Sequence, residues 1–352
     1  MPDKPFHKNP LSMQFDPSDF LPASEDEKKE LIVMRESVTF WKDAGRRLRK
    51  NKVAMGSLIV IILTIVFAFI LPSFYPYAYE QQTRGSENLR PLQYSAEEVA
   101  RKDAGEKVFP HLIGTDTLGR DLMVRVMMGT RISLLVGIVA SFLILIIGSV
   151  YGSVSGLAGG RVDLVMMRIV EVIYTIPDIL IIIILMVTLK KPLERLFETS
   201  PIFDGLSLIG PGLISIFITF SLLYWVGMAR LVRGQVLMLK EQEFVTAARA
   251  MGGSNARIIR RHLIPNTIGT IVVTTSLQIP SAIFTESFLS FLGLGVQAPM
   301  PSLGSLAADA IGGITSYTYR LVAPAITISI VILAFNLFGD GLRDALDPRL
   351  KK

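Results

Sequence analysis

Long apolar runs separated by polar stretches dominate the chain. Six runs are long enough to cross about 30 Å of hydrocarbon, a distance that takes roughly 20 helical residues. These predicted transmembrane helices occupy residues 53–71, 132–159, 164–189, 206–229, 267–295 and 321–339. The pattern therefore predicts an all-α membrane protein with six transmembrane helices.

Glycine, proline and charge inside the runs indicate how these helices pack. Gly148, Gly152 and Gly156 are spaced by four residues, so one face of the second helix is smooth enough for close packing against another helix. Pro177 is expected to kink the third helix. In the same helix Glu171 is expected to pair with Arg168, which lies three residues earlier.

The N-terminal segment precedes the first run and is polar. Residues 1–23 contain five prolines and few apolar residues, so they are expected to be disordered. Residues 24–52 are predicted to form an amphipathic interfacial helix, because Ser24 and Glu27 match a capping box and good helix formers follow. The first transmembrane helix then follows directly.

A long polar loop, residues 72–130, separates the first two runs and is predicted to be extracytoplasmic. Four charged residues near its end are spaced for ion pairs along a short interfacial helix, with a gate or a partner contact as the alternative. These residues are Asp116, Arg120, Asp121 and Arg125. A five-helix core at 131–343 and a cytoplasmic tail at 344–352 complete the predicted organisation.

Basic residues beside the runs predict the orientation. With a cytoplasmic N-terminus, the inner flanks at 42–52, 161, 230–261 and 343–352 hold eighteen lysines and arginines. The outer flanks at 84–90, 120–131, 190–195 and 320 hold nine. Because basic residues favour the cytoplasmic side, both termini are expected in the cytoplasm.

Composition narrows the classes of function. The mean hydropathy is +0.48 and only 19% of the residues are charged, which is too apolar for a soluble protein of 352 residues. The net charge of +6 lies beside apolar runs, which favours a membrane over nucleic acid. Cysteine is absent and the three histidines are far apart, so no disulfide, catalytic thiol or metal site is expected.

A basic stretch, EFVTAARAMGGSNARIIRRHLIP at residues 243–265, interrupts the apolar second half. Its first part has apolar residues at helical spacing and three alanines, so a helix there can lie close against another protein. Gly252 and Gly253 are expected to end this helix, Ser254 to cap a second short one, and Pro265 to mark the entry to the fifth span. The alternative is a basic flank that only contacts lipid headgroups.

The same stretch resembles the EAA motif of inner-membrane subunits of ATP-binding-cassette (ABC) importers. Ala247, Ala248, Gly252 and Pro265 match the motif at its spacing, whereas Thr246, His262 and Ile264 replace its Glu, Ile and Leu. Longer stretches, including HLIGTDTLGRDLMVRVMMGTRISLLVG and ESFLSFLGLGVQAPMPSLGSLAADA, resemble the C-type permease subunit of dipeptide and oligopeptide importers. The resemblance covers almost the whole chain after residue 40.

This resemblance implies a type I ABC importer permease fold with a cytoplasmic coupling helix at 243–252. It implies a non-catalytic subunit that pairs with a homologous B-type permease, two cytoplasmic ATPases and an extracytoplasmic solute-binding protein that delivers peptide. The residues then assigned to ATPase coupling are Glu243, Phe244, Ala247, Ala248, Arg249, Met251, Gly252, Arg257 and Pro265. The chain lacks a Gly-x-x-x-x-Gly-Lys-Ser/Thr loop, so ATP and Mg²⁺ are expected on the partner ATPases.

Charges inside the predicted spans are candidates for the substrate path, because a charge in hydrocarbon is costly. Glu286 is the first candidate, with a buried hydrogen bond to a neighbouring helix or to the partner permease as its alternative. Asp178 either lines the path or supports the kink, and Asp309 lies in an outer loop where it can line the cavity mouth or contact the binding protein.

Other functions are also open on the sequence. Related permeases carry nickel chelates or other small solutes, so the substrate is not fixed by the chain. A self-sufficient secondary transporter would normally show an internal repeat, and none is clear. An intramembrane metalloprotease would need a His-Glu-x-x-His motif, which is absent.

Overall fold

A computed structural model describes residues 22, 39–199, 210–296 and 298–346. The described chain is helical, and within it the structure forms no strand. The predicted disorder of 1–23, apart from Pro22, and the predicted helix over 24–38 lie outside the described residues. The C-terminal tail from residue 347 onward lies outside them as well.

Five helical stretches are long and apolar enough to cross a membrane, and they match five of the six predicted spans. Three of these stretches contain shorter elements. The helix α3 (Lys52–Ile65) continues into a π-helix and a 3-10 turn, and α9 (Pro211–Leu223) continues into α10 (Trp225–Leu239). The helix α12 (Asn255–Ile258) continues into α13 (Ile264–Phe291). The five stretches are Lys52–Ser73, Leu122–Ala158 (α5), Pro211–Leu239, Asn255–Phe291 and Tyr319–Leu346 (α15).

The third predicted span is broken rather than kinked. It consists of α6 (Gly160–Thr175) and α7 (Asp178–Thr199), which meet at 86° and form a sixth span only if the bent pair is counted as one. Pro177 has no N–H, so the carbonyl of Ile173 lacks its usual helical donor. Ile176, directly before the proline, is extended with φ −85° and ψ 134°, as steric conflict with a proline ring favours.

Several predicted boundaries were wrong, and in the following three a capping side chain or a continuous backbone decides the boundary. The helix α5 begins at Leu122, well before the expected residue 132, because the Asp121 carboxylate caps it by accepting from the Val124 N–H. The helix α2 (Phe40–Lys50), which lies within the predicted interfacial helix, ends before residue 52, and the Asn51 side chain caps α3. The segment after Ser254 is not a separate helix but runs without interruption into α13.

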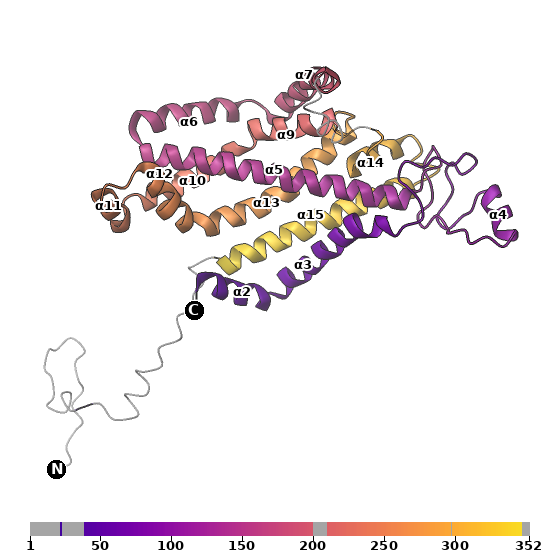
Figure 1. Ribbon diagram of the computed structural model, residues 1–352, viewed down its shortest axis with the longest axis horizontal. Helices are drawn as coiled ribbons and strands as arrows, with labels where there is room; N and C mark the ends of the chain where they lie inside the picture. Colours follow the sequence, from indigo (N-terminus) through magenta and orange to yellow (C-terminus); the bar gives the residue numbers. More distant parts are fainter. Residues whose placement is uncertain (1–21, 23–38, 200–209, 297, 347–352) are drawn as a thin grey trace, which may run out of the picture. The chain divides into compact units, whose positions relative to one another are not determined.

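The tightest helix packing follows the predicted glycine face of α5. A side-chain carbon added at Gly148 would lie 2.6 Å from Met228, and one at Gly156 would lie 2.9 Å from Val236. Both contacts are with α10, so only glycine allows the two backbones to approach this closely. The close-packing prediction is confirmed, and Figure 1 shows α5 running beside α10 and α13.

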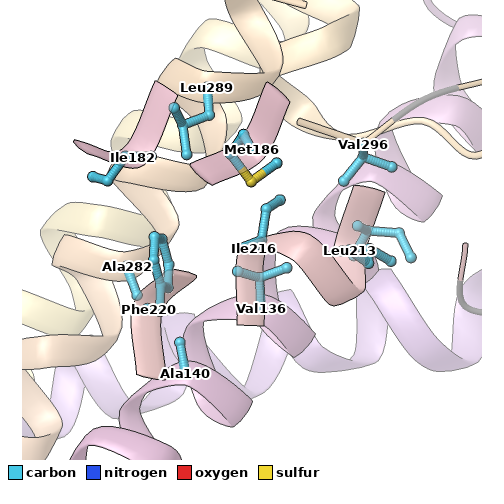
Figure 2. Packing of buried hydrophobic residues seen from close by; sticks show 11 residues of the cluster. Val136, Ala140, Ile182, Met186, Leu213, Ile216, Phe220, Ala282, Leu289 and Val296 are labelled. Atoms are coloured by element: carbon cyan, nitrogen blue, oxygen red, sulfur yellow. The ribbon is translucent and has the colours of Figure 1, made fainter. Parts of the chain in front are cut away.

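A buried apolar cluster joins α5, α7, α9 and α13 (Figure 2). Val136 from α5, Ile216 from α9 and Ile182 from α7 are all fully buried within it. Lipid tails are as apolar as these side chains, so the cluster is stabilised by packing contacts rather than by transfer out of water. It fixes α7 on α9 after the sharp break at Pro177.

Candidate functional site

The helix α11 (Glu243–Ala250) is the EAA-like segment, and it is attached through one face only. Val245 is fully buried and Ala248 is 6% exposed, and both pack in a cluster with Val236 of α10 and Ile258 of α12. The spacing of three between the two buried residues places them on one face of the helix. The rest of α11 is open to solvent.

The exposed residues of the segment include most of those assigned to coupling. Glu243, Ala247 and Arg249 are exposed on α11, and Met251 after it is 83% exposed. Phe244 is 39% exposed and lies 6.3 Å from the His262 ring. Gly252, Arg257 and Pro265 are exposed or half-buried. Of the assigned set, only Ala248 faces the protein itself.

In the turn after α11, Gly252 and Gly253 end the helix and Ser254 caps the next segment, as the sequence predicts. Gly252 has φ +78°, a left-handed conformation that glycine adopts without strain. The Gly253 N–H donates to the Ala248 carbonyl at 3.0 Å, and the Ser254 hydroxyl accepts from the Arg257 N–H at 3.4 Å. A cavity of about 300 Å³ opens beside this turn, lined by Ala248, Met251, Gly253, Arg257, Ile258, Arg261 and His262.

Both ends of α11 are connected to long helices of the core. A turn at 240–242 joins it to α10, and the turn at 251–254 joins it to the continuous stretch Asn255–Phe291. Arg233 of α10 donates to both carboxylate oxygens of Asp163 in α6, at 2.5 and 2.6 Å. The backbone therefore joins α11 to α10 and α13 directly, and this ion pair joins α10 to α6.

The carboxylate of Glu286 is buried between α5 and α13. It accepts hydrogen bonds from the Ser133 hydroxyl of α5 and from the Ser290 hydroxyl one turn later, both at 2.7 Å. Glu286 is 0% exposed. This arrangement is the hydrogen-bonded alternative considered for Glu286, and its role in a substrate path stays a prediction.

The other two path candidates are more accessible. Asp178 is exposed at the start of α7 and lines a cavity of about 520 Å³. Asp309 lies in α14 (Leu303–Ile311), where its carboxylate is 3.8 Å from the Arg125 guanidinium and its side chain is 55% exposed. In the part of the chain that the structure describes, no contact joins these carboxylates to Glu286.

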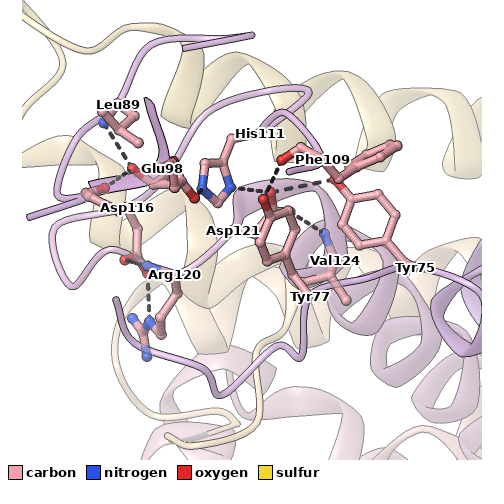
Figure 3. Close-up of polar contacts among 12 residues, drawn as sticks. Tyr75, Tyr77, Leu89, Glu98, Phe109, His111, Asp116, Arg120, Asp121 and Val124 are labelled. Atoms are coloured by element: carbon pink, nitrogen blue, oxygen red, sulfur yellow. Dashed lines mark hydrogen bonds and ion pairs between the residues drawn. The ribbon is translucent and has the colours of Figure 1, made fainter. Parts of the chain in front are cut away.

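The long polar loop, residues 74–121, is folded around a buried histidine that sequence reasoning missed (Figure 3). Nδ1 of His111 lies 2.8 Å from the Asp121 carboxylate, and Nε2 lies 3.0 Å from the Glu98 carboxylate. The ring of Tyr77 stacks on the histidine at 4.5 Å, and the Tyr75 hydroxyl reaches Asp121 at 3.4 Å. All three charged groups are almost fully buried.

These contacts shift the pKa values of His111 and Tyr77 in the loop. Burial alone would lower the pKa of His111, but the hydrogen-bonded Asp121 carboxylate and the nearby Glu98 outweigh it, so the pKa is raised. Burial and the same two carboxylates raise the pKa of Tyr77 to about 12. His111 is therefore favoured as the charged centre between two carboxylates.

The predicted interfacial helix over 116–125 is wrong. Asp116 and Arg120 form an ion pair at 2.7 Å, but they do so across a turn closed by Gly119, which has φ +69°. Arg125 lies in α5, 3.5 Å from the Asp116 carboxylate. The predicted pairing of Arg168 with Glu171 is confirmed at 2.9 Å on exposed α6.

Comparisons with known proteins agree with a chain that spans a membrane. A model of the family "Binding-protein-dependent transport system inner membrane component" matches residues 148–352, more than half of the chain. The chain belongs to this family. A second model, the N-terminal TM domain of oligopeptide transport permease C, matches residues 39–91 of this permease.

Curated relatives span nearly the whole permease. It is 42% identical to the oligopeptide transport system permease protein OppC of Bacillus subtilis, over 95% of this chain and 97% of that one. It is 43% identical to the dipeptide transport system permease protein DppC of the same organism, over 96% and 94%. OppC of Escherichia coli is 39% identical over 89% and 93%.

Proposed function

We propose that this permease is the C-type transmembrane subunit of an ATP-driven importer of dipeptides or oligopeptides in a bacterial cytoplasmic membrane. The observation that carries the proposal is its 42–43% identity to OppC and DppC over at least 94% of both chains. In this role the chain is a multi-pass protein that forms half of the translocation path and catalyses no reaction of its own.

The segment 243–252 acts in this proposal as the coupling helix. Two facts support it: α11 buries only one face against its own chain, and it connects at both ends to helices of the core. A partner ATPase that covers the exposed face would move α10 and α13 as it closes, and the α6 helix through Arg233 and Asp163. Arg249 and Arg257 are available for ion pairs with that ATPase.

The partners supply what this chain lacks. A homologous B-type permease completes the path, two ATPase subunits bind ATP and Mg²⁺, and an extracytoplasmic solute-binding protein delivers the peptide. The twofold excess of basic residues on the α11 side supports cytoplasmic termini, with the 74–121 loop outside. The loop is then placed where a binding protein can reach it.

The proposal is tested by uptake of radiolabelled tri-alanine into lipid vesicles that contain this permease. The expected result is uptake that requires the B-type permease, both ATPases, the binding protein and ATP together. Uphill uptake by this permease alone would instead identify a secondary transporter. If a nickel chelate or another solute is taken up only with the ATPases, and tri-alanine is not taken up, the chain is an importer subunit whose substrate is not peptide.

A further inference from the structure

A stripe of hydrogen-bonding side chains runs along one face of α13. Its members are spaced by four residues and then by three and four, so they stay on one side of the helix. All are exposed or half-buried in this chain. We call them the polar stripe: Asn266, Thr270, Thr274, Gln278, Ser281 and Thr285.

The polar stripe contrasts with the exposed face of the neighbouring helix α15. The large exposed side chains in the middle of α15 are all aliphatic, which is typical of contact with lipid, and they are Val322, Ile326, Ile330, Leu333 and Leu337. The hydroxyls of the stripe can donate to their own helix, as Thr274 does to the Thr270 carbonyl. The amide of Gln278 needs more partners than one helix turn offers, so lipid is a costly neighbour for it.

Two cavities lie along the stripe. One, of about 650 Å³, lies beside its first three members and is also lined by Gln235 of α10 and Arg343 of α15. The other, of about 520 Å³, contains Gln278. The stripe therefore connects a cavity at the α11 end of α13 with a second cavity about halfway along it.

The second cavity lies beside the break between α6 and α7. It is lined by Ile176, Pro177 and Asp178 at the α6–α7 break and by Leu223 and Tyr224 at the junction of α9 and α10. Interrupted helices in membranes are tolerated where their freed backbone groups line a cavity. Ile173, whose carbonyl has no donor from Pro177, is one of the residues that line this cavity.

A negative charge lines this second cavity, and a positive charge contacts one of its lining residues. The exposed Asp178 carboxylate lines it. Tyr174 lines the cavity, and the exposed Arg230 guanidinium lies over its ring, 4.2 Å from the ring centroid. The end of α6, with its partly negative carbonyls, adds to the attraction of a cation beside Asp178.

We infer that the polar stripe is the peptide-contacting wall of the translocation path and that Asp178 receives the α-ammonium group of a peptide. Amide and hydroxyl side chains pair with a peptide backbone whatever its side chains are, which suits a path that passes many sequences. Asp178 and Arg230 match the two charged ends of a zwitterion. The inference rests on the proposed function, since it needs a peptide to be carried.

Single cysteines test the wall, because the chain has no cysteine of its own. Thr274→Cys and Gln278→Cys are placed in the assembled complex, with Leu333→Cys on the aliphatic face of α15 as the matched control. A hydrophilic methanethiosulfonate is expected to label the stripe cysteines at least about tenfold faster than the control, because lipid keeps a thiol protonated. Tri-alanine with binding protein and ATP should slow the stripe reaction about threefold by occupancy.

The charge of the reagent tests Asp178. With Gln278→Cys as the target, Asp178→Asn is expected to lower the ratio of labelling rates of cationic to anionic methanethiosulfonate about fivefold, and Arg230→Gln to raise it by a similar factor. An unchanged ratio in Asp178→Asn would overturn its role. Stripe cysteines that stay unreactive in the assembled complex would mean that the stripe is the interface with the B-type permease.

Peptide uptake by the unmodified complex distinguishes a failure of the path assignment from a failure of the proposed function. If it carries tri-alanine with ATP while the stripe is unreactive or unprotected, the importer stands and the path assignment fails. If it carries no peptide under any condition, the proposed function itself fails.

Discussion

At one end of the α5–α13 pair, the 74–121 loop buries His111 between the carboxylates of Glu98 and Asp121; at the other end, α11 buries only Val245 and Ala248. Both segments connect long helices of the same core (Figure 1). The loop satisfies its buried histidine and carboxylates internally. The helix presents alanines, an arginine and a highly exposed methionine to its surroundings.

The difference indicates two mechanical roles. A buried histidine held by two carboxylates specifies one geometry, since removing the histidine breaks both buried pairs. A helix held by two small apolar contacts resists displacement less, and its exposed face needs a partner to be covered. We therefore expect the loop to behave as a fixed platform and α11 as the part that responds to another subunit.

The largest effect that sharpens this comparison is expected from His111→Ala. The substitution removes the ion-pair partner that the buried Glu98 and Asp121 carboxylates share, so the free energy of unfolding should fall by about 3 to 5 kcal/mol. Thermal unfolding of the purified permease in detergent measures it. Arg101→Ala, which removes an ion pair to Glu106 with both side chains more than half exposed, is the control and should leave the melting temperature unchanged. Equal losses of unfolding free energy in both variants would contradict the claim that the loop is a fixed platform.

The ion pair between Asp163 and Arg233 is expected to give the next largest effect. Arg233→Ala removes two hydrogen bonds from a mostly buried carboxylate, which should cost about 2 kcal/mol of stability. The exchanged double variant, Asp163→Arg with Arg233→Asp, should recover part of both stability and peptide uptake. Recovery of neither would show that the pair does not link α6 to α10 in the way described.

A smaller effect is expected at the turn after α11. Gly252→Ala places a side chain at φ +78°, which should cost about 1 to 2 kcal/mol although the space around it is empty. Gly252→Asn is the matched variant, because asparagine tolerates this conformation better. Peptide-stimulated ATP hydrolysis should follow the order glycine, asparagine, alanine. An alanine variant as active as glycine would show that the turn geometry is unimportant.

The smallest effect is the pH dependence of the 74–121 loop. Because the pKa of His111 is raised in the folded loop, the stabilisation by its charge is fully present below the unfolded pKa of about 6.5 and is lost as the pH rises through the folded pKa. Hydrogen exchange of loop amides, corrected for intrinsic rates, should therefore accelerate with rising pH. His111→Gln should remove this pH dependence, and a variant that retains it would exclude His111 as the cause.

The parts of the fold that depend on local pattern were predictable from the sequence. Apolar length located the spans, the four-residue spacing of Gly148, Gly152 and Gly156 predicted close packing on one face of α5, and Gly252 with Ser254 predicted the turn after α11. The EAA-like spacing located the segment that is proposed for coupling. Each of these signals lies within a few helical turns or one short motif.

The parts that depend on distant partners were not predictable in this way. Glu98, His111 and Asp121 have no periodic spacing, and the capping box that the structure shows at Ser95 and Glu98 is the one local signal that could have indicated order in the loop. Pro177 permits either a kink or a full break of the helix. The broken arrangement is the one in which Ile182 packs in the buried cluster with residues of α9. The cavity at this break was not predictable either, because its wall includes Tyr224 from the distant stretch Pro211–Leu239.

The central claim is that the exposed face of α11 carries the motion of an ATPase into the core. Ala247 is exposed on that face, whereas its neighbour Ala248 is 6% exposed and faces the protein. ATP hydrolysis stimulated by binding protein and tri-alanine, measured in the reconstituted complex with Ala247→Glu, tests the claim most directly. We predict normal melting of the isolated permease and at least about a tenfold loss of stimulated hydrolysis, since an added charge on a docking face is left desolvated. Unchanged stimulated hydrolysis in that variant would contradict the account.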